Sequence, residues 1–286
     1  MYNEVNDMPL EKLPIEEVEK MGYYDFMGYL EVPFFNIGGV GSIDQLGELL
    51  GLNENTKALE IGCGTGGNSC YMANKFGCHV TGIDIAEQMV EQAQAKAVEL
   101  GLTEKVSFKL GNAYELDFDE GSFDVVYTIF VSQFLDPDKV FKEFNRVLVQ
   151  GGMLGINEMY MESEIPSEVE DRVREGVNVF RDITQLPFNV RTDTEWKNAF
   201  ETNGFVDVEL EKFPNASRSI DAFRMVNELG GWWKIVKILW EMTVLALKSK
   251  KIRHLFGLIN KGKNTLVNDK VVSKYAGFIL CVAKKP

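Results

Sequence analysis

The glycine-rich segment Gly62-Cys63-Gly64-Thr65-Gly66-Gly67 constrains the fold of this chain more than any other feature. It follows a run of aliphatic residues typical of a buried strand, and a helical pattern begins directly after it. Glycine allows left-handed backbone conformations and the close approach of a ligand, and the first turn of a helix presents free N–H groups. The segment therefore predicts a strand–turn–helix unit that binds a ligand at the turn.

Strand-like runs alternate with helix-length segments along most of the chain. The runs are Thr56–Ile61, His79–Ile83, Val106–Leu110, Val125–Ile129, Met153–Asn157, Val206–Leu210 and, after a long connection, Tyr275–Ala283. This alternation predicts an α/β fold with a doubly wound, mostly parallel, seven-stranded sheet of the Rossmann-like type. We expect an N-terminal helical lead-in or lid over 1–45, a core over 46–211, a helical insertion between strands six and seven over 212–274, and the final strand within 275–286.

Two glycine fingerprints overlap in the turn, and they indicate different ligands. The dinucleotide pattern G-x-G-x-x-G is met by Gly62, Gly64 and Gly67, and the pattern E-x-G-x-G-x-G by Glu60, Gly62, Gly64 and Gly66. Asp84, after the second expected strand, is suited to bind ribose hydroxyls in either case. The second pattern also uses an acid before the first glycine and a polar residue after the third strand, and Glu60 and Asn112 fill these positions.

Residues 56–157 resemble the core of the class I S-adenosylmethionine-dependent methyltransferases, in particular those that act on quinones, sterols and phosphobases. The late strand Tyr275–Ala283 resembles the antiparallel seventh strand of that fold. The resemblance implies S-adenosylmethionine as the cofactor and S-adenosylhomocysteine as the product, with no metal. It further implies cofactor contacts by Glu60, Gly62, Cys63, Gly64, Asp84, Ile85, Met89, Asn112, Ala113, Thr128 and Gln133.

In the family's pattern each of these residues contacts a different part of the cofactor. The resemblance assigns the methionine end to 60–64, the ribose to Asp84, the adenine face to Ile85 and Met89, the adenine edge to 112–113, and the space beneath the sulfonium to 128–133. Two positions depart from the pattern. Asn112 stands where the family usually has Asp, although its carbonyl can still accept from the adenine amino group. Gln133 stands where many members have His, which removes one candidate base.

Four further residues are candidates for contact with the methyl acceptor. Tyr23 and Tyr24 lie in the aromatic lead-in, which is either a lid over the site or a helix packed on the sheet edge. Glu158 and Tyr160 follow the fifth strand, at the carboxyl edge where ligands of open α/β sheets bind, although Glu158 could equally be a surface charge. No catalytic residue is assigned, because an amine or thiolate acceptor needs no dedicated base.

The formal net charge of −13, from 43 acidic and 30 basic residues, argues against nucleic acid as a partner of the whole protein. The charge is unevenly divided, since 212–274 contains thirteen Lys and Arg against four acids. Within this segment Trp232–Leu247 has polar residues on one helical face and a wide apolar remainder. The insertion has three interpretations: a lid on the core, an interface in an oligomer, or, over 232–263, a peripheral contact with anionic lipid.

The remaining composition fits a reduced intracellular enzyme. The four cysteines form no C-x-x-C pair, and two histidines are too few for a zinc cluster. No secretory signal or membrane-spanning segment is expected, so the predicted location is the cytoplasm, with attachment to the inner membrane surface as an extension. The predicted function is methyl transfer to a small or lipid-like acceptor. Two alternatives stay open: an NAD(P)-dependent oxidoreductase, and a non-catalytic module that binds S-adenosylmethionine.

Overall fold

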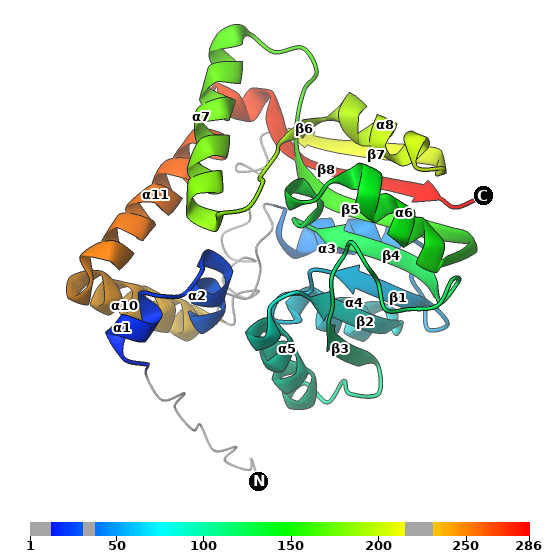
Figure 1. Cartoon of the computed structure of the whole chain (residues 1–286), viewed down its shortest axis with the longest axis horizontal. Helices are drawn as coiled ribbons and strands as arrows, with labels where there is room; N and C mark the ends of the chain where they lie inside the picture. The colour runs from blue at the N-terminus through cyan, green and yellow to red at the C-terminus, as the bar shows by residue number, and fades with distance from the viewer. Residues whose placement is uncertain (1–12, 31–37, 215–230) are drawn as a thin grey trace.

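The computed structural model describes residues 13–30, 38–214 and 231–286. Its centre is a twisted sheet in the order β3-β2-β1-β4-β5-β8-β7 (Figure 1). The strands are β1 (Lys57–Ile61), β2 (His79–Asp84), β3 (Val106–Leu110), β4 (Phe123–Ile129), β5 (Leu148–Met161), β7 (Val206–Pro214) and β8 (Ala276–Lys284). β1 to β5 pair in parallel, and β8 is antiparallel to both of its neighbours, β5 and β7. The predicted α/β architecture with an antiparallel late strand is confirmed.

One strand was not expected. The two-residue strand β6 (Arg191–Thr192) pairs in parallel with the end of β5, beside the main path of the sheet. Two residues are too short to produce an alternating pattern, so no sequence signal marks them. The strand is fixed by its surroundings: Thr192 is the N-cap of α8 (Asp193–Thr202) and forms a capping box with Glu195.

Helices cover both faces of the sheet. On one face α3 (Gly39–Leu49), α4 (Gly67–Phe76) and α5 (Glu87–Glu99) pack their apolar sides against β1 to β4 and β8. On the other face α6 (Pro137–Val147) and α8 bury aromatic residues against β1, β2, β4, β5 and β8. α6 begins at an Asp136 N-cap followed by Pro137, an arrangement that favours a helix start. This two-sided burial explains why the central strands are almost continuously apolar.

A second group of helices lies beyond the carboxyl ends of the parallel strands (Figure 1). These cap helices are α1 (Ile15–Val18), α2 (Tyr23–Tyr29), α7 (Ser167–Thr184), α10 (Trp232–Lys248) and α11 (Lys250–Leu266). α7 and α11 pack together around Val173, Val177 and Leu266. Phe26 and Leu30 pack with Leu245 and Ile252, which joins α1 and α2 to the helix pair α10–α11. The short helices η1 (Ser132–Phe134) and η3 (Val272–Lys274) complete the described elements.

Two of the predicted boundaries between the lead-in, the core and the insertion fall inside secondary-structure elements. The boundary at 45 falls inside α3, whose Ile43 and Leu46 belong to the sheet core, because its apolar periodicity continues on both sides of that position. The boundary at 211 falls inside β7, which continues to Pro214 beside β8. In addition, α7 lies within the range predicted as core but packs with the cap. None of the helices in the described ranges combines the length and the apolar character that a membrane span requires.

Candidate functional site

The glycine turn joins β1 to α4 at the carboxyl edge of the sheet. Gly62, Gly64 and Gly66 have φ angles of 71°, 51° and 76°, in the region that favours glycine. A Cβ on Gly62 would lie 2.5 Å from the Val131 side chain, and one on Gly66 would lie 2.7 Å from Phe108, so both glycines are required by packing. A Cβ on Gly64 would meet nothing within 4 Å. Gly64 is therefore the glycine whose backbone faces open space.

Glu60 lies directly below this turn and is completely buried. One carboxylate oxygen accepts from the hydroxyls of Ser69 and Tyr127, and the other accepts from the Asn68 amide at 3.4 Å. Burial raises the pKa of Glu60 to about 7, although these hydrogen bonds oppose the rise. Glu60 thus connects β1 to α4 and β4. Its contact with the methionine end stays a prediction, and the adjacent Cys63 thiol is buried, which raises its pKa.

Asp84, at the end of β2, faces the glycine turn. Its Oδ2 accepts from the Gly64 N–H at 2.9 Å, and its Oδ1 accepts from the Ala86 N–H at 3.0 Å. Burial raises the pKa of Asp84, and the two backbone bonds oppose that rise. Each oxygen keeps a second lone pair for a ligand. The structure therefore places Asp84 in direct contact with Gly64, whereas the sequence showed only that the two lie 20 residues apart.

The residues expected around the adenine differ in exposure. Ile85 is 77 % exposed, so its side chain offers a free apolar face. Met89 is buried beneath α2, where its Cε lies 3.0 Å from the position of a Cβ on Gly28. Asn112 is exposed, and its Oδ1 already accepts from the Tyr114 N–H at 3.0 Å. The Asn112 side-chain carbonyl, which we expected to bind adenine, therefore already accepts one hydrogen bond from its own loop. The neighbouring Ala113 is half-buried.

The segment after β4 turns sharply beside the glycine turn. Phe130 has a φ of 57°, a strained conformation for an aromatic residue, and its N–H donates to the Asn157 carbonyl at 2.8 Å. The buried Gln133 follows; its Nε2 donates to the Phe130 carbonyl at 3.5 Å. Within the described residues, Gln133 Oε1 is buried without a hydrogen-bond partner. An orphaned acceptor at this edge is the kind of atom that a ligand donor would satisfy.

Glu158 holds this segment in place from β5. Its Oε1 accepts from the Thr128 hydroxyl at 3.0 Å and from the N–H groups of Val131 and Ser132 at 2.9 and 2.7 Å. Its Oε2 is buried and has no hydrogen-bond partner within the described ranges. Burial raises the pKa of Glu158 to about 7, against the effect of those three donors. Glu158 is completely buried, so the alternative of a surface charge is wrong.

Tyr23 and Tyr24 lie on α2, above the sheet edge. The Tyr24 ring packs edge-on against Tyr23 and Phe134, with centroid distances of 5.1 and 5.8 Å. Burial raises the pKa of Tyr24, and the negative charges of Glu158 and Asp84 raise it further. Burial also raises the pKa of Tyr23 to about 12. Through Phe134, Tyr24 therefore packs on the segment that follows β4, which favours the lid interpretation of the lead-in.

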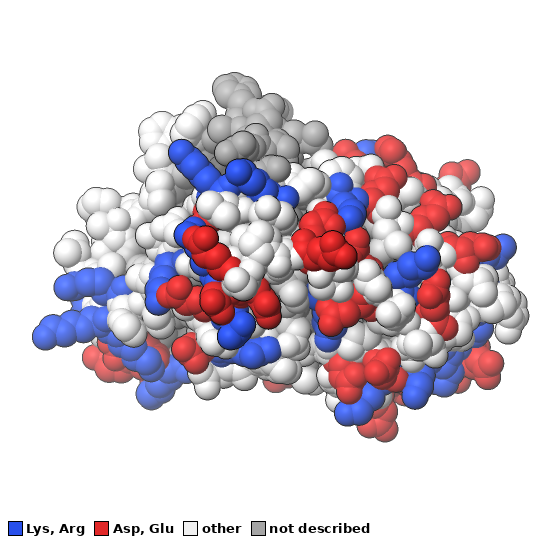
Figure 2. Space-filling model, turned by 90° about the horizontal axis from the view of Figure 1, so that it is seen from above, with Lys and Arg blue, Asp and Glu red and all other residues white. Residues whose placement is uncertain are grey.

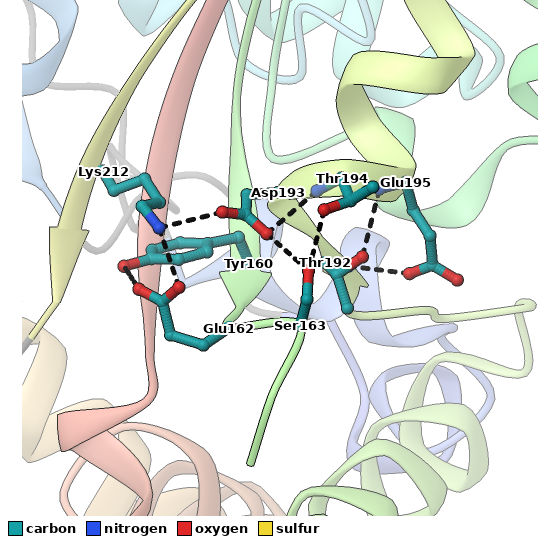
Figure 3. A network of polar contacts seen from close by, with 8 residues as sticks. All are labelled: Tyr160, Glu162, Ser163, Thr192, Asp193, Thr194, Glu195 and Lys212. Carbon is teal, nitrogen blue, oxygen red and sulfur yellow. Dashed lines mark hydrogen bonds and ion pairs between the residues drawn. The ribbon is translucent and has the colours of Figure 1, made fainter.

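Tyr160 belongs to a different neighbourhood (Figure 3). It is completely buried, and its hydroxyl donates to Glu162 at 3.3 Å. The Lys212 ammonium bridges Glu162 and Asp193 at 2.7 and 2.8 Å, and Ser163 donates to Asp193 at 2.8 Å. This polar network joins β5, β7 and the start of α8. Because the Tyr160 hydroxyl is already paired with Glu162 in this network, we leave it out of the proposed acceptor site.

Four residues of the site carried no signal in the sequence. Ser69 and Tyr127 complete the shell of Glu60, and Phe134 packs on Tyr24. The fourth, Arg191, donates to the Ser132 and Leu135 carbonyls at 3.2 and 2.9 Å and stacks over Trp196. Tyr127, Phe134 and Arg191 act through contacts between segments far apart in the chain, which no local motif encodes. Ser69 lies nine residues from Glu60.

The chain is similar to known methyltransferases in sequence and to solved structures in fold. Residues 59–156 match the family model described as "Methyltransferase domain". The sterol 24-C-methyltransferase of Clavispora lusitaniae is 27 % identical over 265 residues, which cover 84 % of this chain and 69 % of that protein. Among solved structures, the cyclase SpnF aligns with a TM-score of 0.70 at 19 % identity, covering 92 % of this chain and 93 % of that one. Geranyl diphosphate C-methyltransferase from Streptomyces coelicolor A3(2) aligns with a TM-score of 0.61 at 15 % identity, covering 86 % and 79 %.

Proposed function

This chain is a methyltransferase of the class I S-adenosylmethionine-dependent type, and from that premise we propose that its acceptor is a hydrophobic, lipid-like molecule. The sulfonium of the cofactor, when bound, supplies an electrophilic methyl group. The protein has to hold the acceptor in line with that group and exclude water. The comparisons support this activity rather than the nicotinamide alternative.

The cofactor half of the proposal is carried by the Gly64–Asp84 contact. Gly64 faces open space, and Asp84 is fixed against it with a free lone pair on each oxygen. A carboxylate in this position can accept from both hydroxyls of a ribose. The exposed Ile85 would lie against the adenine face, and the orphaned Gln133 Oε1 would accept from a donor of the methionine end. The residues present therefore fit S-adenosylmethionine.

The acceptor half rests on a row of aromatic side chains. Tyr24 contacts Phe134, Phe134 contacts Phe188, and Phe188 contacts Phe180, with centroid distances of 5.8, 5.3 and 5.2 Å. The row leads from the edge of the sheet to the cap helix α7. If the acceptor binds along this row it is a hydrophobic one, because burying apolar surface supplies most of the binding free energy. The sterol and terpene substrates named for two similar proteins agree with this choice.

Glu158 is the one acidic side chain in the described structure that we assign to the acceptor side. Its free Oε2 and its pKa of about 7 suit a group that takes a proton from an acceptor as the methyl group arrives. Thr128 and the two backbone donors bind only Oε1, so they orient the carboxyl without occupying Oε2. An acceptor that must lose a proton would then be methylated faster as pH rises through about 7.

Two measurements test the proposal. Titration calorimetry should show binding of S-adenosylhomocysteine and none of NADH, and the reverse result would contradict the cofactor assignment. Transfer of labelled methyl from S-adenosylmethionine should reach prenyl or sterol acceptors in preference to phosphobases and free amines. Glu158→Gln should flatten the pH profile of that transfer while leaving S-adenosylhomocysteine affinity unchanged. If no acceptor in the panel receives label although the cofactor binds, the non-catalytic alternative gains support.

A further inference from the structure

Helix α10 turns an apolar face to solvent. Three tryptophans and three aliphatic residues recur at helical spacing on its outer side, namely Trp232, Trp233, Val236, Leu239, Trp240 and Leu247. Trp233 is 86 % exposed and Leu247 is 74 % exposed. The fourth tryptophan of the chain, Trp196, is completely buried in the sheet core. So large an apolar surface on one helix indicates an interaction site.

The opposite side of α10 is already packed. Leu245 and Met242 contact the cluster formed by Phe26, Leu30 and Ile252, which fixes α10 to α2 and α11. The helix is therefore anchored by one stripe, and its second apolar stripe is not needed for the fold. A 17-residue helix is about 25 Å long, so the free stripe forms a narrow strip rather than a pocket.

Positive charge accompanies the apolar strip. Residues 232–266 contain eight Lys and Arg and one acid, Glu241, in a chain whose net charge is −13. Figure 2 shows basic side chains projecting at the end of the molecule where the cap helices lie, with acidic side chains among them. Lys248 and Lys250, at the junction of α10 and α11, are both exposed. A tryptophan-rich apolar strip bordered by lysines matches the interface of an anionic bilayer, where rings lie at headgroup depth and ammonium groups meet phosphates.

We propose that the outer face of α10, with the start of α11, binds the surface of an anionic lipid membrane. α10 then lies in the plane of the interface, with its tryptophans inserted and its lysines at the headgroups. The same helix pair carries α2, and α2 places Tyr24 over the candidate site. Resting on the proposed function, docking would bring the aromatic row next to a lipid-like acceptor in the membrane. The docking itself does not depend on methyl transfer.

The test uses the full chain and vesicles of phosphatidylcholine, with or without phosphatidylglycerol. Because three of the four tryptophans lie on the proposed face, tryptophan emission should shift to the blue on vesicles containing phosphatidylglycerol and be quenched by lipids brominated near the headgroup. Sedimentation should show weaker binding to phosphatidylcholine alone and a loss of binding as salt rises. The variant Trp232→Ser/Trp233→Ser/Trp240→Ser should bind at least about tenfold more weakly.

Matched variants separate the contribution of the lysine charges from that of the apolar side chains. Lys248→Gln/Lys250→Gln should reduce the preference for phosphatidylglycerol while keeping the emission shift. Val98→Ser/Leu100→Ser, which removes exposed apolar residues at the end of α5, should bind as the parent does. Circular dichroism and S-adenosylhomocysteine titration establish that each variant folds, and they report on the proposed function separately.

Three results would overturn the docking proposal. The first is absence of sedimentation with anionic vesicles, and the second is sedimentation without quenching of the tryptophans. The third is a parent protein that is dimeric and becomes monomeric in the triple serine variant, which would assign the strip to a second copy of the chain.

Discussion

Glu60 makes the stability of the protein depend on pH in a direction opposite to most carboxyl groups. Its carboxyl group is completely buried, and its pKa rises from 4.5 to about 7 on folding. The folded state therefore holds the proton more tightly than the unfolded state. Below about pH 4.5 Glu60 is protonated in both states, so its ionisation does not lower the free energy of unfolding. Above about pH 7 it is ionised in both states, and the free energy of unfolding is lowered by the full amount. Stability contributed by this site is lost as pH rises between those values.

Glu60→Gln removes the ionisable group while keeping its shape. The rise of the pKa from 4.5 to about 7 corresponds to ~3 kcal/mol at most, and linkage over a range of about pH 5.5 to 8.5 gives ~2 kcal/mol. The new amide N–H has an acceptor at hand, since Asn68 Oδ1 is buried without a partner in the described structure. We expect the free energy of unfolding of the variant, relative to the parent, to increase by ~2 kcal/mol across this range.

Urea denaturation followed by far-UV circular dichroism at several pH values measures this difference in the cofactor-free protein. Glu164→Gln removes the same charge from an exposed loop position and controls for net charge. A difference between Glu60→Gln and parent that stays constant with pH would refute the reasoning, because it would mean that Glu60 ionises as easily in the fold as outside it.

Three further outcomes follow from the site. Asp84→Asn should weaken S-adenosylhomocysteine binding by about 1.5–3 kcal/mol in calorimetry, since a charged acceptor of ribose hydroxyls is lost; unchanged affinity would remove Asp84 from the site. Gly66→Ala should lower the free energy of unfolding by about 1–3 kcal/mol, because its Cβ would lie 3.1 Å from the Ala93 Cα at a φ of 76°; equal stability in urea would contradict this. Tyr24→Ala should raise the KM for a hydrophobic acceptor more than Tyr24→Phe does, because the ring packs on Phe134, and equal effects would indicate that the hydroxyl matters instead.

Local patterns were sufficient to predict the sheet. The central parallel strands are almost continuously apolar and β3 alternates apolar with polar residues. Each of these patterns, like each glycine break or helical period, is local to its segment, so their order along the chain already implies the α/β fold. The Gly64–Asp84 pair was predictable for the same reason, because adjacent parallel strands end at the same edge. β6 and the membership of α7 in the cap were not, since two residues hold no period and an amphipathic helix does not specify its partner.

The sequence by itself determined the chemistry that the chain can support: a glycine turn, a carboxylate at the next strand end, and a basic helical segment, all readable because each depends on neighbouring residues. Only the tertiary structure decided how those groups are used. It buried Glu60 and Glu158 on different strands and raised the pKa of each, placed Tyr24 over the strand ends, and left one face of α10 exposed. Burial and orphaned polar atoms arise from contacts between distant segments, and these exist only once the chain has folded.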